Sequence, residues 1–441
     1  MSSKALSLLC LPLTIALGQV PPAKQTTLIK AGHVLDVRSG RCLDNQGILV
    51  EETRIVSVGP YAQIESAAAL AARLIDRSHA TVLPGLIDCH TDLLMVEKLQ
   101  NLVQMSTAER ALLGASVARD ALDAGITTVR DLGSSGVGGD VALGNAIRAG
   151  WTTGPRILAA TRALSPVGGQ FDSMRSGAAK AVVAEEYAGV SGPVEARRAV
   201  DEAIFAGADL IKVIVDTGLR ENYTSVLSEE VLRAIVEQAH RSRAKVAAHA
   251  IMNAGVRAAV QAGVDSIEHA YFASDEVLKM MAERGAYLVP TDSGTPTAFY
   301  TERLLHARQL GVKIAFGSDA RGTVQADAKN EQTFGERSLA TLVGYQKSGM
   351  SPIDIIRTAT LNAADLLGWD DPPGSLAPTE QKWVVDADRD WHNRLGRVEP
   401  GRFADLIAVT GDPLQNIGEL THVQFVMKNG KVIKNTISRL P

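Results

Sequence analysis

The chain has 441 residues, 46% of them hydrophobic, which is enough to bury the core of a large domain and a smaller one and excludes a mostly disordered protein. Its 45 basic and 49 acidic residues give a formal net charge of −4 at pH 7, without a long run of either sign, so we expect no nucleic-acid partner. Aromatic residues make up only 4% of the chain, while 39 residues are Gly, and this composition favours a repetitive α/β packing.

The first residues of the chain have the pattern of a cleavable export signal. Lys4 precedes an apolar run over residues 5–17, and small residues lie at the end of this run. The run is shorter than the ~20 apolar residues that span a bilayer, and two prolines follow at 21–22, so we expect no stable membrane anchor. We predict a signal peptide over residues 1–18 and a secreted or periplasmic mature protein.

Strand and helix patterns then divide the chain into three parts. Alternating apolar positions between Gly and Asn turns over residues 27–84 predict a small antiparallel β unit. From residue 85 onward, apolar runs alternate with helical patterns that end in Gly, which is typical of parallel βαβ units. Strand patterns return after residue 396, so we predict that both chain ends share the small β domain.

The middle part contains about eight candidate strands. We place them at residues 82–90, 126–131, 155–160, 208–215, 244–249, 264–268, 286–290 and 313–317. Eight such units over ~250 to 290 residues match a TIM (β/α)8 barrel in size. The alternative is an open doubly wound sheet, but no GxGxxG turn follows the first strand. Polar residues recur at strand ends, as they do in barrel active sites.

The predicted fold class is therefore α/β, a TIM barrel with a small β-sandwich domain built from both chain ends. We expect a signal peptide at 1–18, β-sandwich parts at 19–84 and 396–441, the barrel at 85–367 and an excursion loop at 368–395. Cys42 and Cys89 fall in different predicted domains, so we expect two free, buried thiols, although an oxidising compartment permits a disulfide.

Metal-capable side chains lie at or near the ends of five predicted barrel strands. They are His90 and Asp92 on the first strand, Lys212 on the fourth, His249 on the fifth, His269 after the sixth and Asp319 after the eighth. Imidazole and carboxylate suit Zn²⁺, Mn²⁺ or Fe²⁺, and three or four protein ligands with an open position make a catalytic site. Taken singly, each residue has an ordinary role as a hydrogen-bonded histidine, a snorkelling lysine or a helix cap. Their joint placement predicts a metal site.

The order of these motifs resembles the amidohydrolase superfamily, in particular its imidazolonepropionase-like and Xaa-Pro dipeptidase (prolidase) branch. The matching segments are LIKAGHVLDVRSG, PGLIDCHTD, TTVRDLG, GADLIKV, VAAHA, SIEHA, GSDA, TLNAADLLG, RVEPGRFADLIAV and VMKNGKVIKN. The resemblance implies a metal-dependent hydrolase in which metal-bound hydroxide attacks an amide or peptide bond. We expect a small-molecule substrate, such as a dipeptide or an N-acyl amino acid.

The resemblance also implies a role for each matching residue. His90 would bind the more buried metal ion, His249 and His269 would bind a second ion, and Lys212 would bridge both ions as a carbamate. Asp319 would bind the first ion and carry a proton to the leaving nitrogen. The implied cofactor is a divalent metal, which we expect to be Zn²⁺, as one or two ions, with the carbamate on Lys212 if two ions bind.

Five positions leave alternatives open. Asp92 stands where the family has the second histidine of His-x-His, so it binds a metal ion, or only hydrogen-bonds a neighbour in a one-metal site, or accompanies loss of the metal. Gln170, in PVGGQFD, replaces a histidine that is expected to hold the substrate, and it can still donate a hydrogen bond. Tyr223 resembles a substrate-contacting tyrosine of the branch, or is an ordinary loop aromatic. Arg220 and Arg321 could bind a carboxylate, although solvated charges are their ordinary role.

Two further functions remain open at this point. Within enzymes, the alternative is hydrolysis of a cyclic amide, a urea or a carbamate. Outside enzymes, the changes at Asp92 and Gln170 suggest a catalytically impaired binding protein. A homo-oligomer is possible, but no segment of the sequence specifies an interface.

Overall fold

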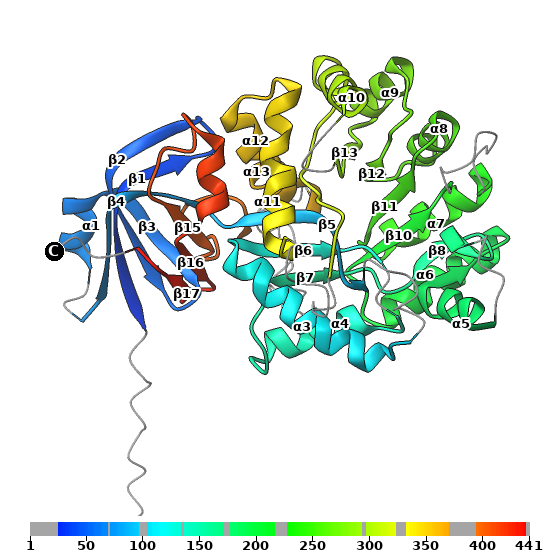
Figure 1. The fold of residues 1–441 in the computed structure, drawn as a ribbon, viewed down its shortest axis with the longest axis horizontal. Helices are drawn as coiled ribbons and strands as arrows, with labels where there is room; N and C mark the ends of the chain where they lie inside the picture. Colours follow the sequence, from blue (N-terminus) through cyan, green and yellow to red (C-terminus); the bar gives the residue numbers. More distant parts are fainter. Residues whose placement is uncertain are drawn as a thin grey trace, which may run out of the picture.

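The computed structural model describes residues 25–68, 71–96, 104–133, 136–171, 177–216, 227–292, 297–322, 332–369 and 394–437. The first and the last described strands lie together in a β unit, and the middle of the chain forms a larger α/β part beside it (Figure 1). No helix within the described residues is long and apolar enough to cross a membrane. The predicted signal peptide, and residues 370–393 of the predicted excursion loop, lie outside the described residues.

The β unit is a single seven-stranded sheet in the order β17-β16-β15-β4-β1-β2-β3. Its strands are β1 (Thr26–Asp36), β2 (Arg41–Glu51), β3 (Arg54–Pro60), β4 (Arg73–Pro84), β15 (Leu406–Val409), β16 (Phe425–Lys428) and β17 (Lys431–Asn435). Apolar residues from both chain ends, such as Ile29, Ile48 and Phe425, share one buried core on this sheet. Strands from both parts of the chain therefore share one sheet, whereas the predicted domain bounds and the division into two stacked layers stay predictions.

The α/β part contains two sheets in which all strands run parallel. The order in the first sheet is β14-β5-β6-β7, and in the second it is β13-β12-β11-β10-β8-β9. The strands are β5 (Leu86–Val96), β6 (Ile126–Asp131), β7 (Arg156–Ala159), β8 (Ala163–Ser165), β9 (Tyr187–Gly189), β10 (Leu210–Ile214), β11 (Lys245–Ala250), β12 (Ser266–His269), β13 (Tyr287–Val289) and β14 (Ala320–Gly322). Six of the eight predicted barrel strands match an observed strand within two residues at each end.

The first and the last predicted strands differ from the structure. The predicted strand at 82–90 combines the end of β4 with the start of β5, because both are apolar and only Gly85 separates them. Residues 313–317 form no regular strand and make one isolated bridge, from Ile314 to Leu288. This segment still hydrogen-bonds to both of its neighbours, because Cys89 N donates to Phe316 O and Leu288 N donates to Lys313 O.

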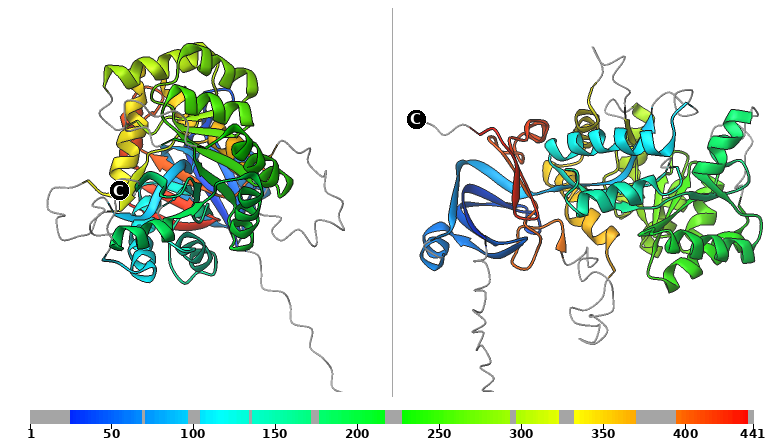
Figure 2. Two further views of the ribbon diagram at one scale, coloured as in Figure 1. Left: turned by 90° about the vertical axis from the view of Figure 1, so that its right-hand side faces the viewer. Right: turned by 90° about the horizontal axis from the view of Figure 1, so that it is seen from below.

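Helices cover the outside of the parallel sheets (Figures 1 and 2). They are α3 (Thr107–Asp123), α4 (Gly139–Arg148), α5 (Gly177–Glu186), α6 (Pro193–Phe205), α7 (Glu229–Arg241), α8 (Asn253–Ala262), α9 (Asp275–Arg284), α10 (Ala298–Gln309), α11 (Phe334–Gly344), α12 (Pro352–Thr358) and α13 (Leu361–Leu367), with α1 (Tyr61–Ala67) in the β unit. Their apolar faces and the strands form one large core. Polar side chains, among them His90 and His269, lie at the carboxyl ends of the strands.

The two described cysteines are free thiols, as expected. Cys89 is buried at the start of the site strand β5. Cys42 is only half-buried, so the prediction that it is buried is wrong. The exposed beginning of β2, where the flanking residues Arg41 and Leu43 face solvent, explains this difference.

Candidate metal centre

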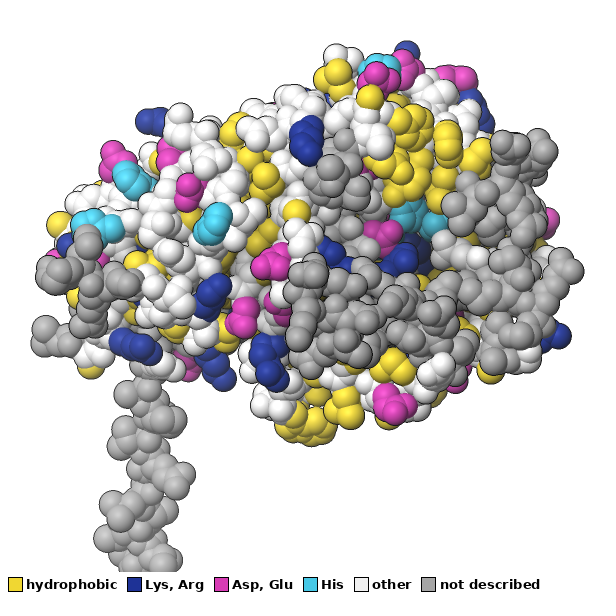
Figure 3. Space-filling model, viewed as in Figure 1, with side chains coloured by type: hydrophobic (Ala, Val, Ile, Leu, Met, Phe, Trp, Pro, Cys, Tyr) yellow, Lys and Arg dark blue, Asp and Glu magenta, His cyan; other side chains and the backbone are white. Residues whose placement is uncertain are grey.

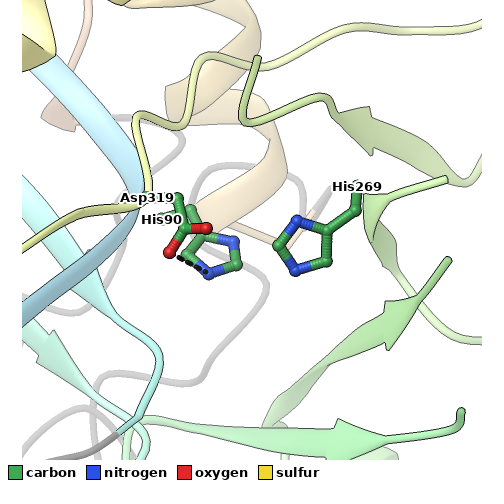
Figure 4. Close-up of side chains that lie close together, drawn as sticks. All are labelled: His90, His269 and Asp319. Atoms are coloured by element: carbon green, nitrogen blue, oxygen red, sulfur yellow. Dashed lines mark ion pairs between the residues drawn. The ribbon is translucent and has the colours of Figure 1, made fainter. Parts of the chain in front are cut away.

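Three of the predicted ligands converge at the carboxyl ends of the strands. His90 lies on β5, His269 ends β12 and Asp319 follows residues 313–317, and one ligand atom of each lies within 4.8 Å of the others. Figure 4 shows Asp319 and His90 on one side of the group and His269 on the other. Nε2 of His90 is 3.8 Å from Oδ1 of Asp319. Two imidazoles and a carboxylate with open positions form a donor set that fits a catalytic zinc ion.

The backbone at these strand ends is strained. His269 has φ 75°, Asp319 has φ 53° and Thr291, at the end of the neighbouring strand, has φ 55°. Residues with a side chain rarely adopt positive φ, and each instance costs on the order of 1 to 3 kcal/mol. Three such residues around one point indicate that the surrounding fold holds these side chains in place for a function.

A buried carboxylate fixes the orientation of His90. Oε2 of Glu268 lies 2.8 Å from Nδ1 of His90, and Oε1 of Glu268 accepts hydrogen bonds from Arg130 at 2.8 Å and from Ser266 at 2.6 Å. Burial alone would raise the pKa of Glu268, but Arg130 and His90 together hold this pKa at about 2. Glu268 is therefore ionised, and it leaves Nε2 of His90 free to bind a metal ion.

His269 is held in an equivalent way. Its Nδ1 lies 2.7 Å from the hydroxyl of Thr291, so its Nε2 faces the group. Its backbone carbonyl accepts a hydrogen bond from the buried Arg303, which also pairs with Asp292. Burial, together with the neighbouring His249 and His90, lowers the pKa of His269 well below 6.5. The neutral imidazole, which is the form that binds metal ions, therefore dominates at neutral pH.

His249, at the end of β11, lies next to His269 with 4.4 Å between the ring centroids. Its ring nitrogens contact Gln170, whose amide nitrogen is 3.2 Å from Nε2 and 3.3 Å from Nδ1 of His249. Tyr187 donates a hydrogen bond of 3.2 Å to the amide oxygen of Gln170. Burial is also the main cause of the lowered pKa of His249. Gln170 therefore lies at the site, in contact with His249, which is a predicted metal ligand.

Asp92 lies against a cation. Pairing of β14 with β5 places Arg321 opposite Asp92, and Nε of Arg321 is 3.4 Å from Oδ2 of Asp92. Another nitrogen of Arg321 is 3.6 Å from Oδ1 of Asp319. Burial and the charge of Asp319 raise the pKa of Asp92, and Arg321 opposes this shift. Arg321 therefore pairs with two carboxylates of the site, while 38% of its side-chain surface stays exposed to solvent.

Lys212 lies on β10, with only 3% of its surface exposed. Within the described part of the chain, its amino group makes no hydrogen bond and no ion pair. Burial lowers its pKa, against the charges of Glu268, Asp92 and Asp319. A buried amine of lowered pKa is the kind of lysine that reacts as a free base. Tyr223 and Arg220 lie outside the described residues.

Three residues of the site, Arg130, Glu268 and Thr291, were not among the predicted site residues. Arg130 lies in TTVRD and Glu268 in SIEHA, and each is a charged residue within an otherwise apolar strand pattern. Charged residues are almost never fully buried unless they are paired, so both positions carried a signal for a buried ion pair. Thr291 gave no comparable signal.

The family model described as "Amidohydrolase family" matches residues 81–381. Ochratoxinase from Aspergillus niger is 30% identical to this chain over 445 residues, covering 93% of this chain and 87% of the relative. The chain therefore belongs to the amidohydrolase family. It is an enzyme of the hydrolase class that acts on carbon–nitrogen bonds.

Solved structures support the same assignment. A Xaa-Pro dipeptidase with methionine bound in its active site matches with a TM-score of 0.77 and 28% identity, covering 93% of this chain and 100% of that one. The crystal structure of A. niger ochratoxinase matches with a TM-score of 0.77 and 25% identity, covering 93% and 96%. A prolidase in complex with N-methylphosphonate-L-proline matches with a TM-score of 0.74 and 27% identity, covering 93% and 100%.

Proposed function

We propose that this protein is a metal-dependent hydrolase that cleaves the amide bond of a dipeptide or an N-acyl amino acid. The observation that carries the proposal is the convergence of His90, His269 and Asp319 at the strand ends, with ligand atoms within 4.8 Å of one another. The similar Xaa-Pro dipeptidase with bound methionine and the similar prolidase with an N-methylphosphonate-L-proline ligand support this substrate class.

The residues of the site fit a divalent ion, for which we propose Zn²⁺. A bound ion would polarise the substrate carbonyl and lower the pKa of a water molecule. His90, held by Glu268, and His269, held by Thr291, would present Nε2 to it. Asp319 would take a proton from the attacking water and give it to the leaving nitrogen. Its side chain is 24% exposed, so it can reach both partners.

We further propose that Lys212 carries a carbamate when a second ion binds, with His249 and His269 as the other ligands. The free amine attacks CO₂, a C–N bond forms and the ammonium proton leaves to solvent, which gives a carbamate with two oxygen donors. The burial of Lys212 and its lowered pKa support this step. A carbamate carbon signal in the ¹³C NMR spectrum after ¹³C-bicarbonate labelling, absent in Lys212→Met, tests it.

We also propose that the parallel strands and residues 313–317 close into one barrel. The hydrogen bonds from Asp209 N to Ala159 O, between the two sheets, and from Cys89 N to Phe316 O support closure. For the chain start, we propose that residues 1–18 are removed on export to the periplasm or the medium. Amino-terminal sequencing of the exported protein tests this point.

A substrate panel tests the proposed reaction. Dipeptides, N-acyl amino acids, hydantoins, phenylureas and carbamates are incubated with Zn²⁺-loaded wild-type protein and with Asp319→Asn. We expect cleavage of dipeptides or N-acyl amino acids and a loss of at least 100-fold in Asp319→Asn. Cleavage of only ureas, carbamates or cyclic amides would replace the proposed substrate class. A protein that binds the ligands without turning over any of them would be a binding protein.

A further inference from the structure

A continuous row of aromatic side chains leads from the metal-binding group to the molecular surface. The ring centroids are 5.4 Å apart from His269 to Tyr271, 5.0 Å from Tyr271 to Tyr300, 5.5 Å from Tyr300 to Phe299 and 5.3 Å from Phe299 to Phe272. All four distances fall in the range of attractive aromatic pairs. We call Tyr271, Phe272, Phe299 and Tyr300 the aromatic wall.

Two separate segments build the aromatic wall. Tyr271 and Phe272 follow β12 directly, and Phe299 and Tyr300 lie in the first turn of α10. Two contacts hold Tyr271 in place. The hydroxyl of Tyr271 lies 3.1 Å from the hydroxyl of Thr291, and the guanidinium carbon of Arg303 lies 5.3 Å from the centre of the Tyr271 ring. The inner end of the wall is therefore fixed by residues that also position His269.

The outer end of the wall is open to solvent. Phe272 is 51% exposed and Phe299 is 44% exposed. In Figure 3, hydrophobic side chains gather beside a hollow in which histidine and charged side chains are visible. Scattered exposed apolar residues are common on proteins, but a contiguous aromatic group beside an active site marks a binding surface. A small polar substrate would leave these aromatic side chains exposed to water, whereas a planar ring would bury them.

The charges at the site decide which half of the substrate faces the wall. Asp319, the proposed proton donor to the leaving nitrogen, lies on the opposite side of the group from His269 (Figure 4). Arg321 is next to Asp319, at 3.6 Å, and its guanidinium can donate hydrogen bonds to the carboxylate on the amine half of an N-acyl amino acid. With the leaving amine at Asp319 and the carbonyl at the centre, the acyl group extends past His269 toward Tyr271.

We propose that the substrates of this enzyme carry a planar aromatic group on the acyl side, which packs against the aromatic wall. This inference rests on the proposed amide hydrolysis and adds a substrate class to it. Tyr271 and Tyr300 form the inner part of the subsite, and Phe272 and Phe299 cover the outer part of the ring system. The wall contributes to binding and specificity and takes no part in proton transfer.

Paired substrates test the proposal. The ratio of kcat/KM for N-(2-naphthoyl)glycine to that for N-acetylglycine is measured for wild type and for the double variant Phe272→Ala/Phe299→Ala. We expect the ratio to fall about tenfold, because kcat/KM for N-(2-naphthoyl)glycine should fall much more than kcat/KM for N-acetylglycine. The matched control is Phe205→Ala, which removes a 95% exposed phenylalanine at the end of α6. An unchanged ratio, or an equal loss for both substrates, would overturn the proposal.

A binding measurement tests the aromatic subsite independently of the proposed amide hydrolysis. Calorimetric titration of the Zn²⁺-loaded protein with 2-naphthoate and with acetate requires no turnover. We expect 2-naphthoate to bind at least tenfold more tightly than acetate, the double variant to lose this preference, and Phe272→Leu/Phe299→Leu to keep part of it. If no amide is cleaved but these results hold, the proposed reaction fails and the aromatic subsite stands. Equal binding of both ligands by wild type would overturn the subsite.

Discussion

Nδ1 of His90 lies 2.8 Å from Oε2 of Glu268, and 4% and 0% of their side-chain surfaces are exposed. The chain separates these residues by 178 positions, so the contact joins the first strand of the α/β part to β12. Arg130, from the strand beside β5, completes the group by pairing with the other oxygen of Glu268. The candidate metal site thus rests on a buried network of charged side chains.

Replacing Glu268 tests this support. We expect Glu268→Gln to weaken zinc affinity about 10- to 100-fold, because His90 would lose the charged acceptor that orients its ring and raises its basicity. Competition with a chelator of known affinity measures the change. The control is Glu237→Gln, in which an exposed glutamate that pairs with Arg197 is replaced. Equal zinc affinity in wild type and Glu268→Gln would show that Glu268 does not support the site.

The close packing of Gly317 against His90 gives a second prediction. A Cβ at residue 317 would lie 2.3 Å from Cγ1 of Val289 and 2.7 Å from Cβ of His90. We expect Gly317→Ala to cost roughly 1 to 3 kcal/mol of unfolding free energy and to weaken zinc binding, because His90 must move. Urea unfolding and chelator competition measure both effects. Gly192→Ala is a control for general glycine effects, because its Cβ would meet no atom within 4 Å and its φ of −151° suits any residue. A variant with wild-type stability and affinity would contradict the packing argument.

The pair of Asp92 and Arg321 gives a third prediction. Asp92→His restores the family residue but removes the carboxylate from beside Arg321. We expect kcat/KM to fall about tenfold, because Arg321 would lose Asp92, the closer of its two carboxylate partners. The double variant Asp92→His/Arg321→Met should recover part of this loss. A large gain of activity in Asp92→His alone would mean that Asp92 is a handicap and that its pairing with Arg321 has no role in catalysis.

The lowered pKa values of His249 and His269 predict how the metal-free protein responds to acid. Both groups stay neutral in the folded state, whereas the unfolded state takes up protons below pH 6.5. Their contribution to stability is therefore present above pH 6.5 and is lost as the pH falls, by up to about 1.4 kcal/mol per pH unit for each histidine.

Urea unfolding in the presence of a chelator at pH 7.5, 6.5 and 5.5 measures this loss. The variant His249→Asn should lose less stability than wild type between pH 6.5 and 5.5. Buried carboxylates whose pKa is raised, such as Asp88, contribute with the opposite sign, but they are present in both proteins. Identical pH dependence of the two proteins would show that His249 is not held neutral.

Local patterns predicted most of the strands and the three side chains that converge at the strand ends. The strand predicted at 126–131 coincides with β6, because its apolar run is bounded by turn signals on both sides. His90, His269 and Asp319 were predicted from their position after such runs, since parallel strands bring their carboxyl ends together. In contrast, residues 313–317 have the composition of a strand but make only one β-bridge in the structure. Asp319, two residues further along the chain, has a positive φ.

Local sequence patterns could not predict which residues contact the candidate metal ligands. The pairing of Glu268 with Arg130 joins residues that are 138 positions apart, and nothing near either residue specifies the other. Arg321 reaches Asp92 only because the short strand β14 pairs with β5. The contact of Gln170 with His249 likewise depends on how the loop after β8 folds back over β11.

The most direct test of the central claim is the metal content of purified protein, measured together with amide hydrolysis before and after metal removal. The account predicts at least one equivalent of divalent metal per chain, loss of N-acyl amino acid or dipeptide hydrolysis after dialysis against a chelator, and recovery on adding Zn²⁺. In His90→Ala/His269→Ala, both the metal and the hydrolysis should be lost. A metal-free wild-type protein with unchanged hydrolysis, or a metal-loaded protein that cleaves no amide, would contradict it.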